Sequence, residues 1–144
     1  MLYLIDSSVL VRTLHAFDPD STTAREALRK LSDRRDTLCV IPQVVAEFWA
    51  VATRPRANNG LGFTPERVNR SLTRYREAFE LHFETRAVYE GWRRLALDQH
   101  VRGKQTHDAR LAAAVLAHGI DRILTFNTKH FGRYSIEVVH PADL

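Results

Sequence analysis

Acidic side chains occur at three points of the chain where the surrounding residues are apolar. Asp6 follows the apolar run LYLI, Glu47 lies in PQVVAEFWAVATR, and Asp108 lies in GKQTHDARLAAAVLAHG. At helical spacing, Glu47 and Asp108 fall on the apolar faces of their segments. Three carboxylates brought together there would repel one another unless a cation lay among them. Hard oxygen ligands without cysteine or paired histidine favour Mg²⁺ or Mn²⁺.

Each acid taken singly also has a structural explanation. Asp6 precedes two serines and could serve as the N-cap of a helix that begins at Ser7. Glu47 could lie at the margin of the apolar stripe, extended to solvent or paired with an arginine. Asp108 would lie in the first turn of its helix, where the helix dipole favours an acid by a few tenths of a kcal/mol, roughly. These alternatives stay open until the three positions are known in space.

Short apolar runs predict the strands that must position these acids. They are Leu2–Ile5, Thr37–Ile41, Ile123–Thr125 and Ile136–Val139. Helix starts are predicted at Ser7, at the capping box Thr23 to Glu26, at Pro42 and at Thr64–Pro65, with further helices over about Thr85–Gln99 and about Thr106–His118. Strands that alternate with helices indicate an α/β fold with a parallel sheet covered on both faces. Sites in such sheets lie beyond the carboxyl ends of the strands, where Asp6 falls.

Composition is that of an ordinary soluble domain. The 144 residues suit one domain, and 44% are hydrophobic and 26% charged. No apolar run approaches the roughly 18 residues of a membrane span, and the N-terminus does not read as a secretory signal, so we expect a cytoplasmic protein. The net charge is +4, and all but three of the 21 basic residues are arginine. An arginine-rich surface suits a phosphate-bearing partner, although most such side chains simply face solvent.

Four segments in order, LIDSSVL, IPQVVAEFWAV, GKQTHDARLAAAVLAHG and ILTFNTKHFGRY, resemble a PIN domain. The resemblance is closest to the VapC-type toxin ribonucleases of type II toxin–antitoxin pairs. It spans nearly the whole chain and implies one PIN-like nuclease domain over residues 1–144. The implied fold is a three-layer α/β/α sandwich with a central, mostly parallel sheet.

The same resemblance implies an active site. Asp6, Glu47 and Asp108 would hold a divalent metal, Mg²⁺ with Mn²⁺ as a substitute, and Asn127 would be the fourth catalytic residue. Asn127 takes a position where the family has Asp or Asn, and its amide oxygen brings no charge. It could equally serve in capping or in a turn.

Other residues are supporting candidates. Ser7 and Thr125 could orient the carboxylates or a water molecule, or have no chemical role. Arg110 matches a basic residue near the family's site. Candidate phosphate contacts are the arginines around and within the helix after Pro65, namely Arg54, Arg56, Arg67, Arg70 and Arg74.

The implied activity is metal-assisted hydrolysis of RNA phosphodiester bonds, with single-stranded or looped RNA as substrate. The implied partners are a small cognate antitoxin, operator DNA through that antitoxin, and a second copy in a homodimer. Two alternatives remain: a PIN nuclease of RNA processing outside a toxin–antitoxin pair, and a non-catalytic PIN-fold module that binds nucleic acid or protein. A phosphatase of the DxD type is excluded because Ser8 stands two residues after Asp6.

Overall fold

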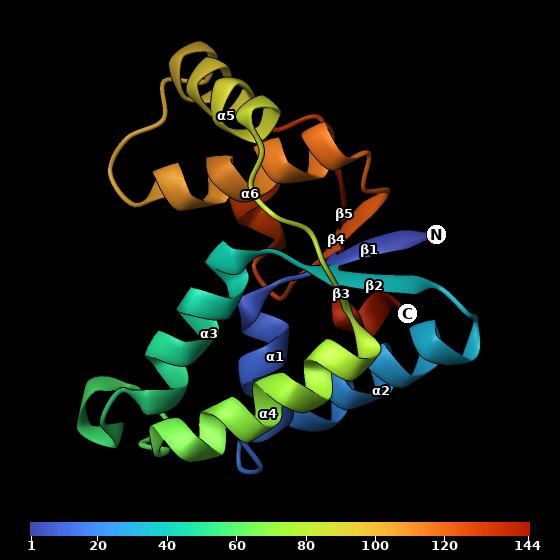
Figure 1. Ribbon diagram of the computed structural model, residues 1–144, viewed down its shortest axis with the longest axis vertical. Helices are drawn as coiled ribbons and strands as arrows, with labels where there is room; N and C mark the ends of the chain where they lie inside the picture. Colours follow the sequence, from blue (N-terminus) through green and yellow to red (C-terminus); the bar gives the residue numbers. More distant parts are fainter.

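The apolar runs of the sequence form a parallel sheet in this computed structural model, which describes residues 1–144 (Figure 1). The strands are β1 (Leu2–Ile5), β2 (Thr37–Val40), β3 (Glu80–Leu81), β4 (Arg122–Leu124) and β5 (Glu137–Val139). Their order across the sheet is β3-β2-β1-β4-β5, and every pairing is parallel. The first strand of the chain is therefore the central strand of the sheet.

The register of the sheet brings its carboxyl ends to one edge. Leu4 lies beside Cys39 of β2 on one side and beside Ile123 of β4 on the other. The ladder continues one residue past β1, because the Asp6 N–H donates to the Leu124 carbonyl oxygen at 3.0 Å. Asp6 is thus fixed by the backbone at the end of the central strand.

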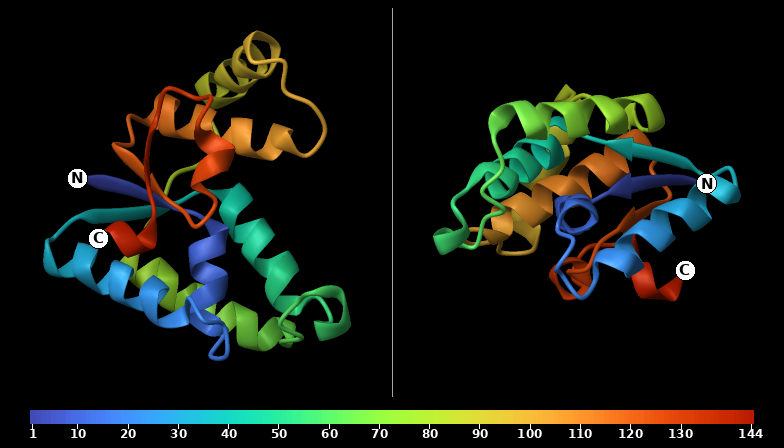
Figure 2. Two further views of the ribbon diagram at one scale, coloured as in Figure 1. Left: turned by 180° about the vertical axis from the view of Figure 1, so that it is seen from behind. Right: turned by 90° about the horizontal axis from the view of Figure 1, so that it is seen from below.

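Helices cover both faces of this sheet. They are α1 (Ser7–Leu14), α2 (Ser21–Asp33), α3 (Pro42–Thr53), α4 (Pro65–Ala78), α5 (Arg86–Asp98) and α6 (Gln105–His118), with short 3₁₀ turns η1 (Arg56–Asn58), η2 (Thr128–Phe131) and η3 (Pro141–Asp143). The views in Figures 1 and 2 place α5 and α6 on one side of the sheet and α1, α2 and α4 on the other. The fold is the expected three-layer α/β/α sandwich.

The core forms between the sheet and these helices. Leu4, Ile5 and Ile123 of the sheet are fully buried, as are Val44 and Phe48 of α3. Because Val44 and Phe48 anchor one face of α3, Glu47 between them is held close to the sheet edge. None of the helices has the length and apolar character that crossing a bilayer requires.

The sequence does not predict one strand and places the start of one helix wrongly. The strand β3 was not predicted, because its two residues, Glu80 and Leu81, carry no periodic signal. The capping box at Thr23 does not form, since α2 begins at Ser21 with Asp20 in the N-cap position. A turn ahead of the helix explains the earlier start: the Asp20 N–H donates to the Asp18 carboxylate at 2.8 Å.

Candidate active site

A cavity of about 530 Å³ opens at the carboxyl edge of the sheet and is lined by residues from separate parts of the chain. The predicted carboxylates of Asp6, Glu47 and Asp108 all line it, together with Ser7 and Asn127. β1 delivers Asp6, α3 delivers Glu47, and the first turn of α6 delivers Asp108. The structure therefore gathers in one cavity five predicted residues from four segments that lie far apart in sequence.

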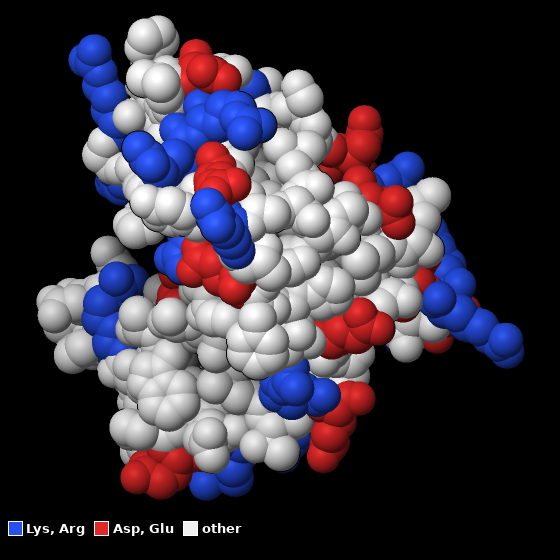
Figure 3. Space-filling view, turned by 45° about the horizontal axis from the view of Figure 1, so that its top comes forward, with Lys and Arg blue, Asp and Glu red and all other residues white.

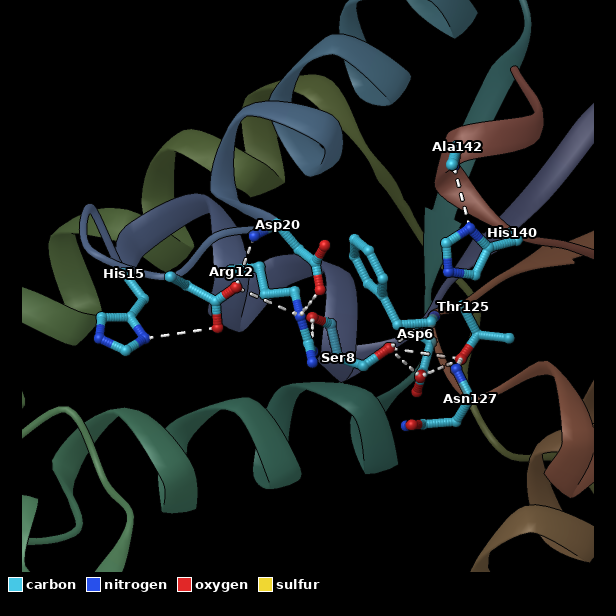
Figure 4. Close-up of polar contacts among 11 residues, drawn as sticks. Asp6, Ser8, Arg12, His15, Asp20, Thr125, Asn127, His140 and Ala142 are labelled. Carbon is cyan, nitrogen blue, oxygen red and sulfur yellow. Dashed lines mark hydrogen bonds and ion pairs between the residues drawn. The ribbon is translucent and has the colours of Figure 1, made fainter.

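Asp6 is almost completely buried, and its carboxylate does not cap α1. It occupies the N-cap position of that helix but makes no capping hydrogen bond through its side chain. Its Oδ2 atom instead accepts the Thr125 hydroxyl at 2.6 Å and the Ser8 hydroxyl at 2.6 Å (Figure 4). The capping explanation for Asp6 is wrong, because the side chain is turned across the sheet edge toward β4.

Glu47 is held by neutral side chains rather than by an arginine. Its Oε1 atom accepts the Gln43 amide at 2.9 Å, and its Oε2 atom accepts the Ser7 hydroxyl at 3.1 Å. The same Gln43 amide donates to the His107 carbonyl oxygen at 2.9 Å, which ties α3 to the start of α6. Glu47 thus forms no ion pair, and the arginine-paired alternative is wrong.

Asp108 lies in the first turn of α6 with its side chain toward the cavity. Burial raises the pKa of its carboxyl above the ordinary value of 3.8, and the nearby charges of Asp6 and Glu47 raise it further. His130 opposes this shift, with its Nδ1 atom 3.4 Å from Asp108 Oδ2. A favourable helix dipole would lower the pKa, so repulsion and burial in the cavity outweigh it.

Asn127 and Thr125 lie where β4 leaves the sheet. The Thr125 hydroxyl, which donates to Asp6, accepts the Asn127 N–H at 3.0 Å. Asn127 precedes the turn η2 but makes no side-chain cap there, so its amide is left to face the cavity. The hydrogen bonds around Thr125 join the β4 end to Asp6.

The chemistry of these donors fits a hard divalent cation. The side chains as they stand do not bring three acidic, histidine or cysteine residues into contact with a common point. They do place three carboxylates on one cavity, and two of them raise the pKa of the third. A cation among them would relieve that repulsion, and oxygen ligands of this kind are those of Mg²⁺ and Mn²⁺.

Basic residues that the sequence analysis missed surround the same cavity. Lys104 precedes α6, and Lys129 and Arg133 lie in and after η2; all three are exposed and line the cavity. The available signal was their position in the chain, since Lys104 stands four residues before Asp108 and Lys129 two residues after Asn127. An acidic centre with a basic rim is suited to a phosphate group bound together with a cation.

The arginines predicted to bind RNA do not line this cavity. Arg54 and Arg56 donate to carbonyl oxygens of their own loop, and the Arg67 guanidinium lies over the Phe63 ring, 3.6 Å from its centroid. Arg110 forms an ion pair with Glu84. Figure 3 shows basic and acidic side chains interspersed over one face of the molecule rather than gathered by sign. A role in RNA binding for these residues, Arg70 and Arg74 included, stays a prediction.

The cysteine of the chain offers no competing chemistry. Cys39 lies in β2 and is fully buried. Burial, with a smaller contribution from the charge of Glu80, raises the pKa of its thiol to about 12. A thiol of this kind is not a nucleophile at neutral pH.

Solved structures share this fold at low sequence identity. VapBC2 from Rickettsia felis, bound to a DNA fragment of its promoter, superposes with a TM-score of 0.74 at 17% identity, covering 97% of this chain and 98% of that chain. DNA-bound VapBC from Salmonella typhimurium gives a TM-score of 0.69 at 18% identity, covering 98% of this chain and 99% of that chain. VapC20 from Mycobacterium tuberculosis, a Sarcin-Ricin loop cleaving toxin, gives a TM-score of 0.66 at 16% identity, covering 89% of this chain and 92% of that chain.

Sequence comparison supports the same grouping. No curated protein matches the sequence at a significant level. The family match is to the PIN domain and extends over residues 3–137, which includes each of the four predicted catalytic residues. The chain belongs to the PIN domain family.

Proposed function

We propose that this protein is a Mg²⁺-dependent endoribonuclease that acts as the toxin of a type II toxin–antitoxin pair. One observation carries the nuclease part of the proposal: Asp6, Glu47, Asp108 and Asn127 line one cavity at the carboxyl edge of the sheet in a PIN domain. The toxin part is supported by likeness in fold to VapBC complexes and to a toxin that cleaves the Sarcin-Ricin loop.

In this proposal the three carboxylates are the ligands of the cation. When bound, Mg²⁺ lowers the pKa of a water molecule and stabilises the charge that develops on the phosphate. Asp6 is fixed by its hydrogen bonds to Ser8 and Thr125, whereas the Asp108 carboxylate contacts only the exposed His130. Asn127 offers a neutral amide that can orient a water molecule without adding charge.

In this proposal the basic residues at the rim of the cavity bind the RNA backbone. Lys104, Lys129 and Arg133 lie around the same cavity as the acids, so they can hold the phosphates next to the scissile bond. Cations at the rim also offset the acids, which would otherwise repel a polyanion. The protein therefore separates two tasks within one cavity, with oxygen ligands for the metal and side-chain cations for the RNA backbone.

Purified protein should cleave single-stranded RNA in the presence of Mg²⁺ or Mn²⁺ and stop when a chelator is added. The reason is that the proposed cation activates the attacking water, which the carboxylates and the amide of the cavity do not do alone. End-labelled RNA and DNA of the same sequence, incubated with each metal and then with excess chelator, give the measurement. Cleavage that continues in chelator would exclude the metal mechanism.

Replacing Lys129 with Gln should weaken RNA binding by the loss of one phosphate contact. The slope of log affinity against log salt concentration should become shallower by about 0.7, the value for one contact to a single strand. Titration of labelled RNA at several salt concentrations measures this slope. Lys30→Gln removes the same charge from α2, a helix that does not line the cavity, and is the matched control. An equal loss in both variants would mean that the rim has no special role.

The proposal extends to partners. The two solved VapBC complexes are bound to DNA, in one case a promoter fragment, and we infer that this chain likewise pairs with a small antitoxin that brings operator DNA to the complex. We also propose a homodimer and one nuclease domain over residues 1–144. Co-expression with the protein encoded beside it should suppress toxicity if that protein is the antitoxin.

A further inference from the structure

The hydroxyl of Ser8, in the first turn of α1, shares one oxygen of Asp6 with the hydroxyl of Thr125. Both donate to Asp6 Oδ2 at 2.6 Å, and the two hydroxyl oxygens lie 3.3 Å apart (Figure 4). Thr125 is fully buried and Ser8 is partly buried. The two side chains come from opposite ends of the sequence, 117 residues apart.

The direction of these hydrogen bonds follows from the chemistry of the partners on both sides. The Phe126 N–H donates to Ser8 Oγ at 3.2 Å, and the Asn127 N–H donates to Thr125 Oγ1 at 3.0 Å. An amide N–H can only donate, so each hydroxyl acts as an acceptor toward the turn. A carboxylate oxygen can only accept, so each hydroxyl donates its single proton to Asp6 Oδ2, and both protons point to the same atom.

The other oxygen of Asp6 is left almost free. Oδ1 receives only the Ser7 hydroxyl, at the long distance of 3.5 Å, and that hydroxyl lies closer to Glu47 Oε2, at 3.1 Å. Because Oδ2 is engaged by Ser8 and Thr125, the carboxylate cannot rotate without breaking two short hydrogen bonds. Oδ1 is thereby presented to the cavity as a ligand atom.

Arg12 contacts both Ser8 and Phe126. Its Nη1 atom donates to the Ser8 carbonyl oxygen at 3.0 Å, and its guanidinium lies over the Phe126 ring, 4.4 Å from the centroid. Ion pairs with Asp18 and Asp20 fix the Arg12 side chain. Phe126, whose N–H donates to Ser8, is thus kept in place relative to α1.

We propose that Ser8 is a positioning residue of the active site, which fixes the Asp6 carboxylate with Oδ1 toward the metal and ties the turn carrying Asn127 to it. The consequence for metal binding rests on the proposed function. A purely structural role would differ, since Ser8 would then contribute to the stability of α1 and its loss would leave metal affinity unchanged.

Three variants separate these roles. Ser8→Ala removes the donor to Asp6 and the acceptor for Phe126, and Ser8→Thr keeps the hydroxyl. Thr13→Ala is the matched control on the same helix, because the Thr13 hydroxyl donates to the Leu10 carbonyl oxygen at 2.7 Å and lies away from the cavity. Mn²⁺ affinity by electron paramagnetic resonance and crystal structures of wild type and Ser8→Ala in chelator give readouts that do not depend on activity.

We expect Ser8→Ala to weaken Mn²⁺ binding about tenfold and to lower kcat with little change in KM for RNA. Ser8→Thr should restore Mn²⁺ affinity to within about twofold of wild type, and Thr13→Ala should not change it. The crystal structure of Ser8→Ala should show the Asp6 carboxylate rotated. Unchanged Mn²⁺ affinity in Ser8→Ala would overturn the inference.

The proposed function can fail separately. If wild type binds no Mn²⁺, the metal-dependent nuclease is wrong, and the crystal structures alone decide the role of Ser8. An Asp6 carboxylate that keeps its orientation in Ser8→Ala would overturn the positioning role, and a rotated one would support it.

Discussion

Replacing Asp6 with Asn should lower RNA cleavage by at least about a hundredfold while leaving the fold intact. An asparagine at this position can still accept the Ser8 and Thr125 hydroxyls through its carbonyl oxygen. Its NH₂ group then faces the cavity in place of Oδ1, and an NH₂ group is a donor that cannot ligate a cation. Initial rates of RNA cleavage at saturating Mn²⁺ measure the loss.

Asp98→Asn is the matched control, because Asp98 is an exposed carboxylate at the end of α5, away from the cavity. It should cleave RNA at the wild-type rate. In cells, induction of wild type or Asp98→Asn without antitoxin should arrest growth, whereas Asp6→Asn should not. Equal toxicity of Asp6→Asn and wild type would show that the growth effect does not pass through this site.

Replacing Asp108 with Asn should raise the melting temperature in chelator and remove most of the stabilisation that Mn²⁺ gives to wild type. The raised pKa of Asp108 means that its ionised form is disfavoured in the folded state, so the carboxylate costs stability at neutral pH. For wild type, Mn²⁺ at one hundred times its dissociation constant adds about 2.7 kcal/mol to the free energy of unfolding. The variant lacks a ligand and should gain much less.

The pH dependence gives this prediction a second test. The cost of ionised Asp108 is full above its raised folded-state pKa and absent below the ordinary value of 3.8. Asparagine does not titrate, so the difference in melting temperature between the variant and wild type should shrink as the pH falls through that window. Thermal melts in chelator at several pH values measure it.

A decrease in stability caused by Asp108→Asn would support the helix-dipole explanation. If Asp108 only stabilises the start of α6, Asp108→Asn should lower stability by a few tenths to about 1 kcal/mol and leave the response to Mn²⁺ unchanged. Glu66→Gln, in the first turn of α4, shows the size of a dipole effect in the same protein. A loss of stability equal to that of Glu66→Gln would mean that Asp108 is not a ligand of the metal.

The sheet and the three acids could be predicted because their signals are local. The run before Asp6 is apolar and short, and the helical periodicity around Glu47 and Asp108 places each acid on an inward face. A parallel sheet then brings the segments to one edge without further information. The family resemblance added Asn127, whose own sequence context would have suited a turn equally well.

The partners of these side chains could not be predicted, since they depend on contacts between distant segments. Gln43 reads as an ordinary helical residue, yet its amide joins Glu47 to the backbone of α6. The sequence singled out the arginines of α4 by their number, whereas the basic residues around the cavity are Lys104, Lys129 and Arg133. Whether a charged residue faces the cavity depends on where its loop lies in the folded protein, which the sequence alone does not give.

The central position of β1 has a consequence for synthesis. β1 is synthesised first but can pair only after its neighbours β2 and β4 have been made. Thr125, whose hydroxyl donates to Asp6, is synthesised 119 residues after Asp6. Until β4 pairs with β1, the Asp6 carboxylate lacks the hydrogen bond from Thr125, and the Asp6 N–H lacks the Leu124 carbonyl oxygen. A polypeptide released by a ribosome before residue 122 therefore carries the acids without the arrangement that makes them a nuclease. We therefore expect fragments from interrupted translation not to cleave RNA.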